Sequence, residues 1–250
     1  MNKNKIEFVG FYGSDELIAL SAWTSTSREL DDQKKSRIPA MLDTLWSANH
    51  ETPFEKATIH FLVDTEIASH IHLLKHRISS LNGESARYKE LKEDKYYIPE
   101  DWKNIISTES LYIHEEGENG KEISWKQGEK WSTILQEYTE IGNYLYHHAL
   151  EDLTLVLGRK RAKESARFFK TYNSQIQADI SFNMRSFANF IKLRNSEHAQ
   201  LEIREIAQQM WDLVQTKTYG HFENTLRVID ERIQFEQKCQ KYKQLILELE

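Results

Sequence analysis

Residues that break helices are scarce in this chain, which has nine glycines and three prolines among 250 residues. Because turns and helix ends often use these two residues, their scarcity predicts long helices joined by few tight turns. The segments with apolar residues at helical spacing, or otherwise expected to be helical, are 30–50, 66–77, about 127–155, a stretch beginning at Arg185, 197–215 and 222–250. Pro39 is expected to break or kink the first of them. The chain should therefore be mostly helical.

Three segments have the pattern of a β-strand. SQIQADISFNM, at 174–184, alternates apolar and polar residues with the period of a half-buried strand. IEFVGFYG at 6–13 and ATIHFLVD at 57–64 are the other two predicted strands. The polar stretch after the 66–77 helix is predicted to be a loop, and the segment 111–126, rich in Gly, Glu and Asn, a surface excursion.

Composition excludes several classes of protein. The formal net charge is -6, with 39% hydrophobic and 29% charged residues, which is typical of a mildly acidic globular protein and disfavours a general nucleic-acid binder. No apolar run approaches the roughly 18 residues of a membrane helix, and the first residues lack the apolar core of a signal peptide, so the cytoplasm is the expected location. Cys239 is the only cysteine, which rules out an intrachain disulfide or a thiolate zinc cluster.

The stretch KHRISSLNGESARY, at 75–88, concentrates hydrogen-bond donors and cations. A second basic segment, 167–200, places Asn183, Arg185 and Arg194 along a predicted strand end and helix. A guanidinium matches two phosphate oxygens at once, so two such clusters in an acidic protein indicate a focused anion site. A solvated turn and separate surface salt bridges remain the alternatives on composition alone.

Metal and common nucleotide motifs are not evident. His72 and His76 lie one helical turn apart near His70, but no further ligand accompanies them and there is no H-E-x-x-H, so no metal is expected. The sequence also has no G-x-G-x-x-G and no G-x-x-x-x-G-K-[ST]. Any nucleotide must then be held by another arrangement.

Three segments together resemble the flavin-dependent thymidylate synthases. KHRISSLNGESARY resembles their signature R-H-R-x-x-S-x-N-E-x-S-x-R-Y, with matches at His76, Arg77, Ser80, Asn82, Ser85, Arg87 and Tyr88. HETPFE at 50–55 resembles the element H-x-[ST]-P-F-E, and 183–203 resembles N-x-R-S-x-x-N-F-x-x-L-R-x-x-x-H-A-Q-x-E-I. The resemblance covers roughly residues 5–220.

The resemblance implies an α+β fold, with an antiparallel β-sheet flanked by long helices, in one domain over 1–250. It implies a homotetramer with active sites shared between subunits, without nucleic-acid or membrane partners. The implied reaction transfers a methylene group from methylenetetrahydrofolate (the folate substrate) to C5 of dUMP, with FAD as the hydride donor and NADPH as the reductant. Classical thymidylate synthases need a cysteine nucleophile, whereas a flavin hydride donor removes that need, and Cys239 is poorly placed for the role.

The resemblance also implies site residues. Arg194, facing the uracil edge, and Ser85 are the candidate catalytic residues. The residues expected around FAD are Ser25, His50, Thr52, Glu55, Lys75, His76, Arg77, Asn183, Arg185, Asn189 and His198. Those expected around dUMP are His72, Lys75, Gly83, Glu84, Ser85, Ala86, Arg87, Arg167, Leu193 and Arg194. His50 and Tyr88 are expected near the folate.

The chain departs from the family pattern at a few positions. Lys75 stands where the family usually has Arg, and His72 where Gln is frequent. Gly83 occupies the place of the signature glutamate and is followed by Glu84. The R-x-x-L-P pattern around the phosphate arginine is missing, so Arg167 is assigned by its spacing to the later motif. Either Glu84 serves in place of the glutamate, or the carboxylate is dispensable, or this is a diverged relative with a different one-carbon or redox reaction.

Overall fold

The computed structural model describes residues 3–113 and 123–247, which fall into two compact units. The first unit comprises Met1–Asn4, Asp64–Ile71 and Gly83–Gln177. The second comprises Lys5–Val63, His72–Asn82 and Ala178–Glu250. The chain thus passes between the units several times, and a single domain over 1–250 stays a prediction.

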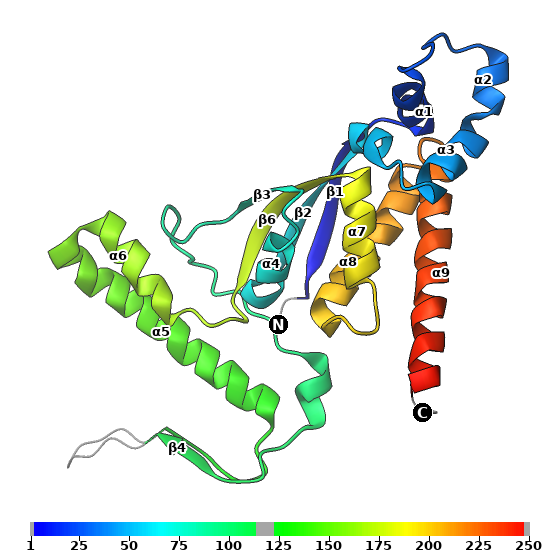
Figure 1. The fold of residues 1–250 in the computed structure, drawn as a ribbon. Helices are drawn as coiled ribbons and strands as arrows, with labels where there is room; N and C mark the ends of the chain where they lie inside the picture. The colour runs from blue at the N-terminus through cyan, green and yellow to red at the C-terminus, as the bar shows by residue number, and fades with distance from the viewer. Residues whose placement is uncertain (1–2, 114–122, 248–250) are drawn as a thin grey trace, which may run out of the picture. The chain divides into compact units, whose positions relative to one another are not determined.

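A four-stranded antiparallel sheet has the strand order β1-β2-β6-β3 (Figure 1). Its strands are β1 (Lys5–Tyr12), β2 (Thr58–Glu66), β6 (Gln175–Asn183) and β3 (Ser80–Gly83). The three predicted strands are confirmed, and so is the helix that follows β2, α4 (Ile67–Leu74). The prediction of a continuous loop after that helix was wrong, because β3 lies within it. Its four residues are too few for a period of two to stand out.

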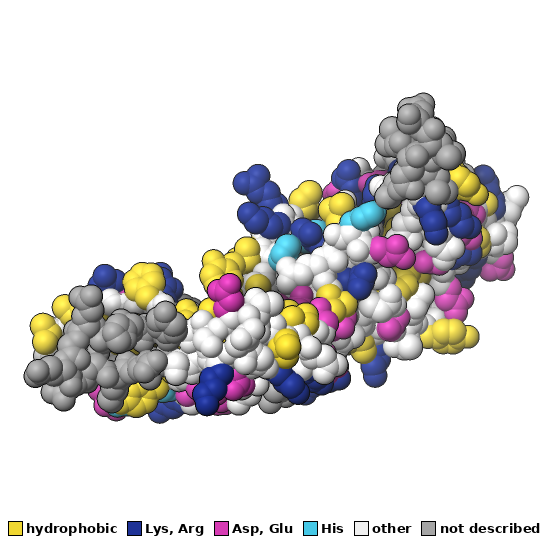
Figure 2. Space-filling view, turned by 90° about the horizontal axis from the view of Figure 1, so that it is seen from below, with side chains coloured by type: hydrophobic (Ala, Val, Ile, Leu, Met, Phe, Trp, Pro, Cys, Tyr) yellow, Lys and Arg dark blue, Asp and Glu magenta, His cyan; other side chains and the backbone are white. Residues whose placement is uncertain are grey.

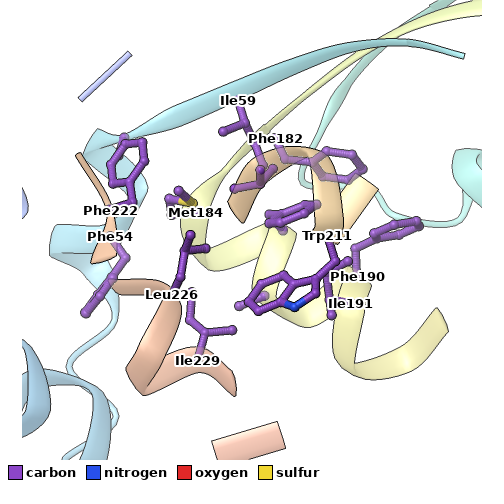
Figure 3. Packing of buried hydrophobic residues seen from close by; sticks show 14 of the residues in the cluster. Phe54, Ile59, Phe182, Met184, Phe190, Ile191, Trp211, Phe222, Leu226 and Ile229 are labelled. Atoms are coloured by element: carbon purple, nitrogen blue, oxygen red, sulfur yellow. The ribbon is translucent and has the colours of Figure 1, made fainter. Parts of the chain in front are cut away.

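Helices bury the hydrophobic face of the second unit. They are α1 (Asp15–Trp23), α2 (Asp32–Ser36), α3 (Ile38–Ser47), α7 (Met184–Arg194), α8 (Leu201–Lys217) and α9 (Glu223–Leu247), with the 3-10 helix η1 (Thr52–Lys56). α8 packs on β1, and α7 packs on α8 and η1. Figure 3 shows Ile59 and Phe182 from the strands facing Phe190 of α7 and Trp211 of α8. Burying each such side chain contributes about 1.5–3 kcal/mol, so this core holds α7 firmly on the sheet.

Local signals account for the helix boundaries in this unit. The predicted 30–50 helix is divided at Arg37, which ends α2 and precedes α3. Pro39 lies in the first turn of α3, where its missing N–H costs no helical hydrogen bond. At the far end of the chain, the Asp15 carboxylate accepts hydrogen bonds from the backbone N–H groups of Asn224 (2.8 Å) and Thr225 (2.9 Å) and so caps α9.

The first unit is built on a helical pair. Its elements are β4 (Leu111–Ile113), β5 (Ile123–Trp125), α5 (Trp131–Leu157), α6 (Arg159–Ala166) and the 3-10 helices η2 (Glu100–Asn104) and η3 (Arg167–Phe169). Gly158, with φ +77°, ends α5 and lets α6 fold back along it (Figure 1). The pair buries Tyr146, Leu150 and Ala162.

The predicted surface excursion at 111–126 lies partly outside the described residues. Its two ends form the short antiparallel pair of β4 and β5, with Leu111 opposite Trp125. The sequence analysis did not predict these strands, because three residues show no recognisable period. Among the described residues, no helix combines the length and apolar character that a membrane span requires.

Candidate nucleotide-binding site

The donor-rich stretch continues past β3 into the first unit, where Glu84 is held by the neighbouring strand. The Glu84 backbone N–H donates to the Gln177 carbonyl at 2.7 Å, and the Gln177 N–H donates to the Glu84 carboxylate at 3.3 Å. Lys89 Nζ donates to the same carboxylate at 2.6 Å, and this bond raises the pKa of Lys89. The acid next to Gly83 is thus already engaged by two donors.

Ser85 and Arg87 follow in a tight turn. The Ser85 hydroxyl accepts a hydrogen bond from the Arg87 backbone N–H at 3.3 Å, and the Ser85 carbonyl accepts from the N–H groups of Tyr88 and Lys89. The Arg87 guanidinium is exposed and reaches Glu164 of α6 only at 3.4 Å. An exposed pair at this distance is worth little, so Arg87 remains available to a phosphate.

A glycine places the second phosphate candidate, Arg167, the first residue of η3. A Cβ built on Gly142 of α5 would lie 2.7 Å from the Phe169 carbonyl oxygen, so only glycine lets η3 approach α5 this closely. Glu164, the partner of Arg87, precedes Arg167 by three residues. The ion pair between Arg87 and Glu164 therefore brings the segment that carries Arg87 close to the segment that carries Arg167. Sequence reasoning missed Gly142, although an isolated glycine in a helical pattern is a signal for close packing.

His70 of α4 lies against Gly83. A Cβ built on Gly83 would lie 2.9 Å from His70 Cε1 and 3.2 Å from its Nε2. The His70 Nδ1 atom is buried and has no hydrogen-bond partner among the residues that the structure describes, and burial lowers the pKa of the ring. The sequence analysis considered His70 only as a metal ligand, and no group of three or more His, Cys, Asp or Glu suited to a metal occurs among the described residues.

In the second unit, His76 and Arg194 form a pair. Arg194 Nε donates to His76 Nε2 at 3.0 Å, and the His76 and Phe190 rings form a T-shaped pair with their centroids 4.9 Å apart. Burial, followed by the charge of Arg194 and then His72, lowers the pKa of His76 to about 4. His76 is therefore neutral at pH 7, and its lone pair holds Arg194 in place.

Arg185 and Asn189 of α7 line a pocket of about 90 Å³ in the second unit. Arg185 donates to Glu51 at 3.0 Å and to Glu55 at 2.6 Å, and these acids raise its pKa. α9 contributes Arg232 to the same pocket, a residue outside the part of the chain that the family motifs cover. No sequence motif indicated this role, because Arg232 is one of many charged residues on a helix that was expected to be solvated.

The remaining predicted residues of the second unit are mostly exposed. Asn183 caps α7, accepting from the Ser186 N–H at 2.8 Å, so its side chain has a structural role. Ser25 donates to the Ala22 carbonyl. The other exposed residues from the predicted sets are His50, Thr52, Lys75, Arg77, Leu193 and His198, while His72 is partly buried.

The residues assigned to FAD all belong to the second unit, whereas those assigned to dUMP occur in both. Lys75 and Arg77 are exposed and, within the part of the chain that the structure describes, pair with no carboxylate. Lys75 and Arg77 can therefore donate freely to phosphate oxygens, as the phosphates of a bound FAD would require. Arg185 is less suited to this, because two acids offset its charge. Figure 2 shows cationic and anionic side chains interspersed on one face. Against such a mixed surface, cations without a carboxylate partner are better candidates for an anion site than paired ones.

Comparison with known proteins gives concordant matches. The family model described as thymidylate synthase complementing protein matches residues 8–218. The flavin-dependent thymidylate synthase of Thermosipho melanesiensis is 30% identical over 228 residues, covering 91% of this chain and 92% of the relative. That of Thermosipho africanus is 29% identical with the same coverage, and that of Tropheryma whipplei is 26% identical over 238 residues, covering 89% of this chain and 93% of the relative.

One solved structure has a similar fold. It is the crystal structure of a UMP/dUMP methylase, PolB from Streptomyces cacaoi, bound with 5-Br dUMP. The TM-score is 0.67 at 24% sequence identity, and the match covers 92% of this chain and 96% of that chain. At this identity the similarity concerns the fold, and it agrees with an antiparallel sheet flanked by helices.

Proposed function

The chain belongs to the thymidylate synthase complementing protein family, and from this premise we propose that it is a flavin-dependent thymidylate synthase. It converts dUMP to dTMP, with methylenetetrahydrofolate as the carbon donor, FAD as the hydride donor and NADPH as the reductant. The observation that carries the proposal is the pairing of Arg194 with a neutral His76, which fixes a cation on the helix that follows the sheet.

Arg194 serves the uracil ring. C5 of uracil becomes a better nucleophile when negative charge on the ring is stabilised, and a preorganised cation can do this in a site shielded from water. The bond to His76 uses only Nε, so the two terminal nitrogens of the Arg194 guanidinium can donate to the uracil edge. The flavin, when bound, supplies the hydride, which removes the need for a cysteine nucleophile.

Arg87, Arg167 and Ser85 bind the phosphate of dUMP. The long contact between Arg87 and Glu164 supports this assignment, because a phosphate can replace a weakly held carboxylate. Gly142 supports it as well, since it fixes the backbone of the segment that carries Arg167. Each guanidinium can give two parallel hydrogen bonds to phosphate oxygens, and the Ser85 hydroxyl adds a third donor.

Lys75 and Arg77 hold the phosphates of FAD, and Tyr88 and His50 lie near the folate. Tyr88 is 73% exposed, as expected for an aromatic ring that gains a stacking partner when a ligand binds. We further propose a homotetramer with shared active sites. Large apolar side chains are exposed on α5 and η3, including Leu155 (86%) and Phe168 (80%), and such exposure is typical of a surface that another subunit covers.

The second candidate is a diverged relative that binds FAD and a pyrimidine nucleotide but performs another one-carbon or redox reaction. The observation that favours it is Gly83 at the place of the signature glutamate, with the Glu84 carboxylate engaged by Lys89 and Gln177. If residue 83 is essential for the ordinary reaction, the change would redirect the activity.

Two measurements on the purified protein and one in a bacterial host separate these candidates. The protein should bind FAD, seen as flavin absorbance that remains after gel filtration. Incubation with dUMP, methylenetetrahydrofolate and NADPH should then yield dTMP, measured by chromatography, and the gene should rescue a synthase-deficient host without thymidine. A protein that binds FAD and dUMP but makes no dTMP would favour the diverged relative. A colourless protein that does not respond to FAD would contradict both candidates.

A further inference from the structure

The His70 ring occupies the space that a side chain at residue 83 would need. The contact of 2.9 Å between a Cβ at position 83 and His70 Cε1 is shorter than real Cβ contacts. A residue larger than glycine therefore has to displace the imidazole. Because the atoms in the way belong to the far end of a side chain and not to the backbone, the displacement moves the ring without breaking the fold.

The ring carries a hydrogen-bonding atom that the fold does not use. An unpaired buried polar atom lowers the stability of a fold, and among the described residues Nδ1 of His70 is such an atom. An apolar residue like the nearby Ile67 and Ile71 would fill the same helix position without that cost. Ser69 has an unpaired hydroxyl too, but the whole residue is enclosed, whereas the His70 ring is only partly buried, although its Nδ1 atom is covered. Part of the ring is therefore open to a ligand, and a turn of the ring would bring Nδ1 to it.

Burial keeps the ring neutral. It lowers the pKa of His70 below its ordinary value of 6.5, so at pH 7 the ring has one N–H donor and one acceptor nitrogen. Gly83, on which it packs, directly precedes Glu84 and Ser85, at the start of the turn that positions Arg87. The unpaired nitrogen thus belongs to a side chain in contact with the proposed dUMP-binding segment.

We propose that His70 is a dUMP-binding residue, which supplies from α4 the polar contact that the family signature places on the side chain at position 83. This inference rests on the proposed function. His70 replaces a charged carboxylate with a neutral imidazole, which can both donate and accept. In this assignment Gly83 is required because it makes room for the ring, and Glu84 is not the replacement.

The test is the affinity for dUMP, measured by isothermal titration calorimetry on the full chain with FAD in excess. His70→Leu keeps much of the volume and removes the hydrogen-bonding atoms, and should raise the Kd for dUMP about tenfold. His70→Asn restores a donor and an acceptor and should stay within about threefold of the wild type. The matched control is His148→Leu, because His148 is exposed on α5 and its ring bonds the Tyr144 carbonyl of the same helix.

A second set of variants tests whether His70 and a side chain at residue 83 compete for the same space. Gly83→Glu alone should weaken dUMP binding, because the new side chain displaces the ring. The double variant His70→Ala/Gly83→Glu should recover affinity relative to either single variant, since the smaller residue frees the space. This non-additivity is what a shared volume predicts. Gly10→Glu is the glycine control, because a Cβ at Gly10 meets nothing within 4 Å.

The outcomes distinguish failure of the proposed function from failure of the role of His70. If the wild-type chain does not bind dUMP, the proposed function fails and the role of His70 fails with it. If the wild type binds dUMP and His70→Leu binds it within twofold, only the role of His70 is overturned. Because the calorimetric arm with Leu and Asn decides the matter alone, a Gly83→Glu variant that fails to fold does not affect the conclusion.

Discussion

His70 and His76 come from one stretch of sequence, and burial lowers the pKa of both, yet their nitrogens have different uses. His76 accepts a hydrogen bond from Arg194 and packs on Phe190, so the fold already uses its acceptor nitrogen. His70 packs on Gly83 with Nδ1 unpaired. Burial is thus the main cause of the lowered pKa in both rings, with the charges of Arg194 and His72 adding to it at His76. The neighbours of each histidine decide whether it orients a protein group or remains available to a ligand.

The largest expected effect comes from removing the group that His76 orients. Arg194→Ala should lower the rate of dTMP formation by about 10²- to 10³-fold, because the charge on the uracil ring loses its fixed cation. FAD binding should persist, since Lys75 and Arg77 are untouched. Rate and flavin absorbance are measured on the same sample. Arg227→Ala, which removes a surface arginine paired with Asp43 and Glu231, is the matched control.

Near-normal turnover of Arg194→Ala would contradict the role of the pair. Loss of FAD together with activity would instead show that Arg194 serves cofactor binding. His76 would then support the FAD site through Arg194, whereas His70 would support the dUMP site.

An intermediate effect is expected from His76 itself. The pKa of His76 in the folded chain is about 4, below its ordinary 6.5, so the unfolded chain binds the proton more readily between these values. Stability from this group is complete above about pH 6.5 and is lost as the pH falls toward 4. His76→Asn should remove that part of the pH dependence, on the order of 1 kcal/mol after solvent screening, measured by urea unfolding at pH 7 and pH 4.5.

The same variant should lower turnover about tenfold while Arg194 remains present. If the wild type and His76→Asn lose stability equally between pH 7 and pH 4.5, His76 is not the buried neutral group described. His148→Asn provides the comparison, because that ring is exposed.

The smallest effect is expected at Glu84, the carboxylate beside Gly83. Glu84→Ala should change the affinity for dUMP less than twofold, because this carboxylate bonds Lys89 and Gln177. Its loss should cost up to about 1 kcal/mol of stability, typical of an exposed ion pair. Calorimetric titration with dUMP and thermal unfolding measure the two quantities. A tenfold loss of affinity would identify Glu84, and not His70, as the replacement for the signature glutamate.

Much of the fold could be predicted from periodicity. The long strands and most helices have enough residues for a period of two or of 3.6 to be recognised, and Pro39 correctly indicated a helix break. β3, β4 and β5 were missed because strands of three or four residues are defined by their partners. The division into two units was not predicted either, because it depends on contacts between distant segments.

The candidate site was predictable only where residues act through motifs. The motif residues include Arg194 and His76, but the bond between them is a property of the folded chain. Gly142 acts by leaving space for the Phe169 carbonyl, and His70 by filling the space that Gly83 leaves. The isolated glycine at 142 is a signal for close packing but does not identify its partner, and the role of His70 leaves no pattern in the sequence, because each role joins residues that are distant along the chain.

The close approach of His70 to Gly83 also limits the order in which substitutions at these positions can accumulate. A glutamate introduced at 83 first meets the imidazole at 2.9 Å and has to displace it, whereas a smaller residue introduced at 70 first leaves space that a glutamate can then occupy. The two positions are therefore epistatic. Both single steps are expected to weaken dUMP binding, but only the step at residue 70 avoids the steric conflict. Return to the family signature is therefore expected to pass through a weaker binder in which the helix has changed before the strand.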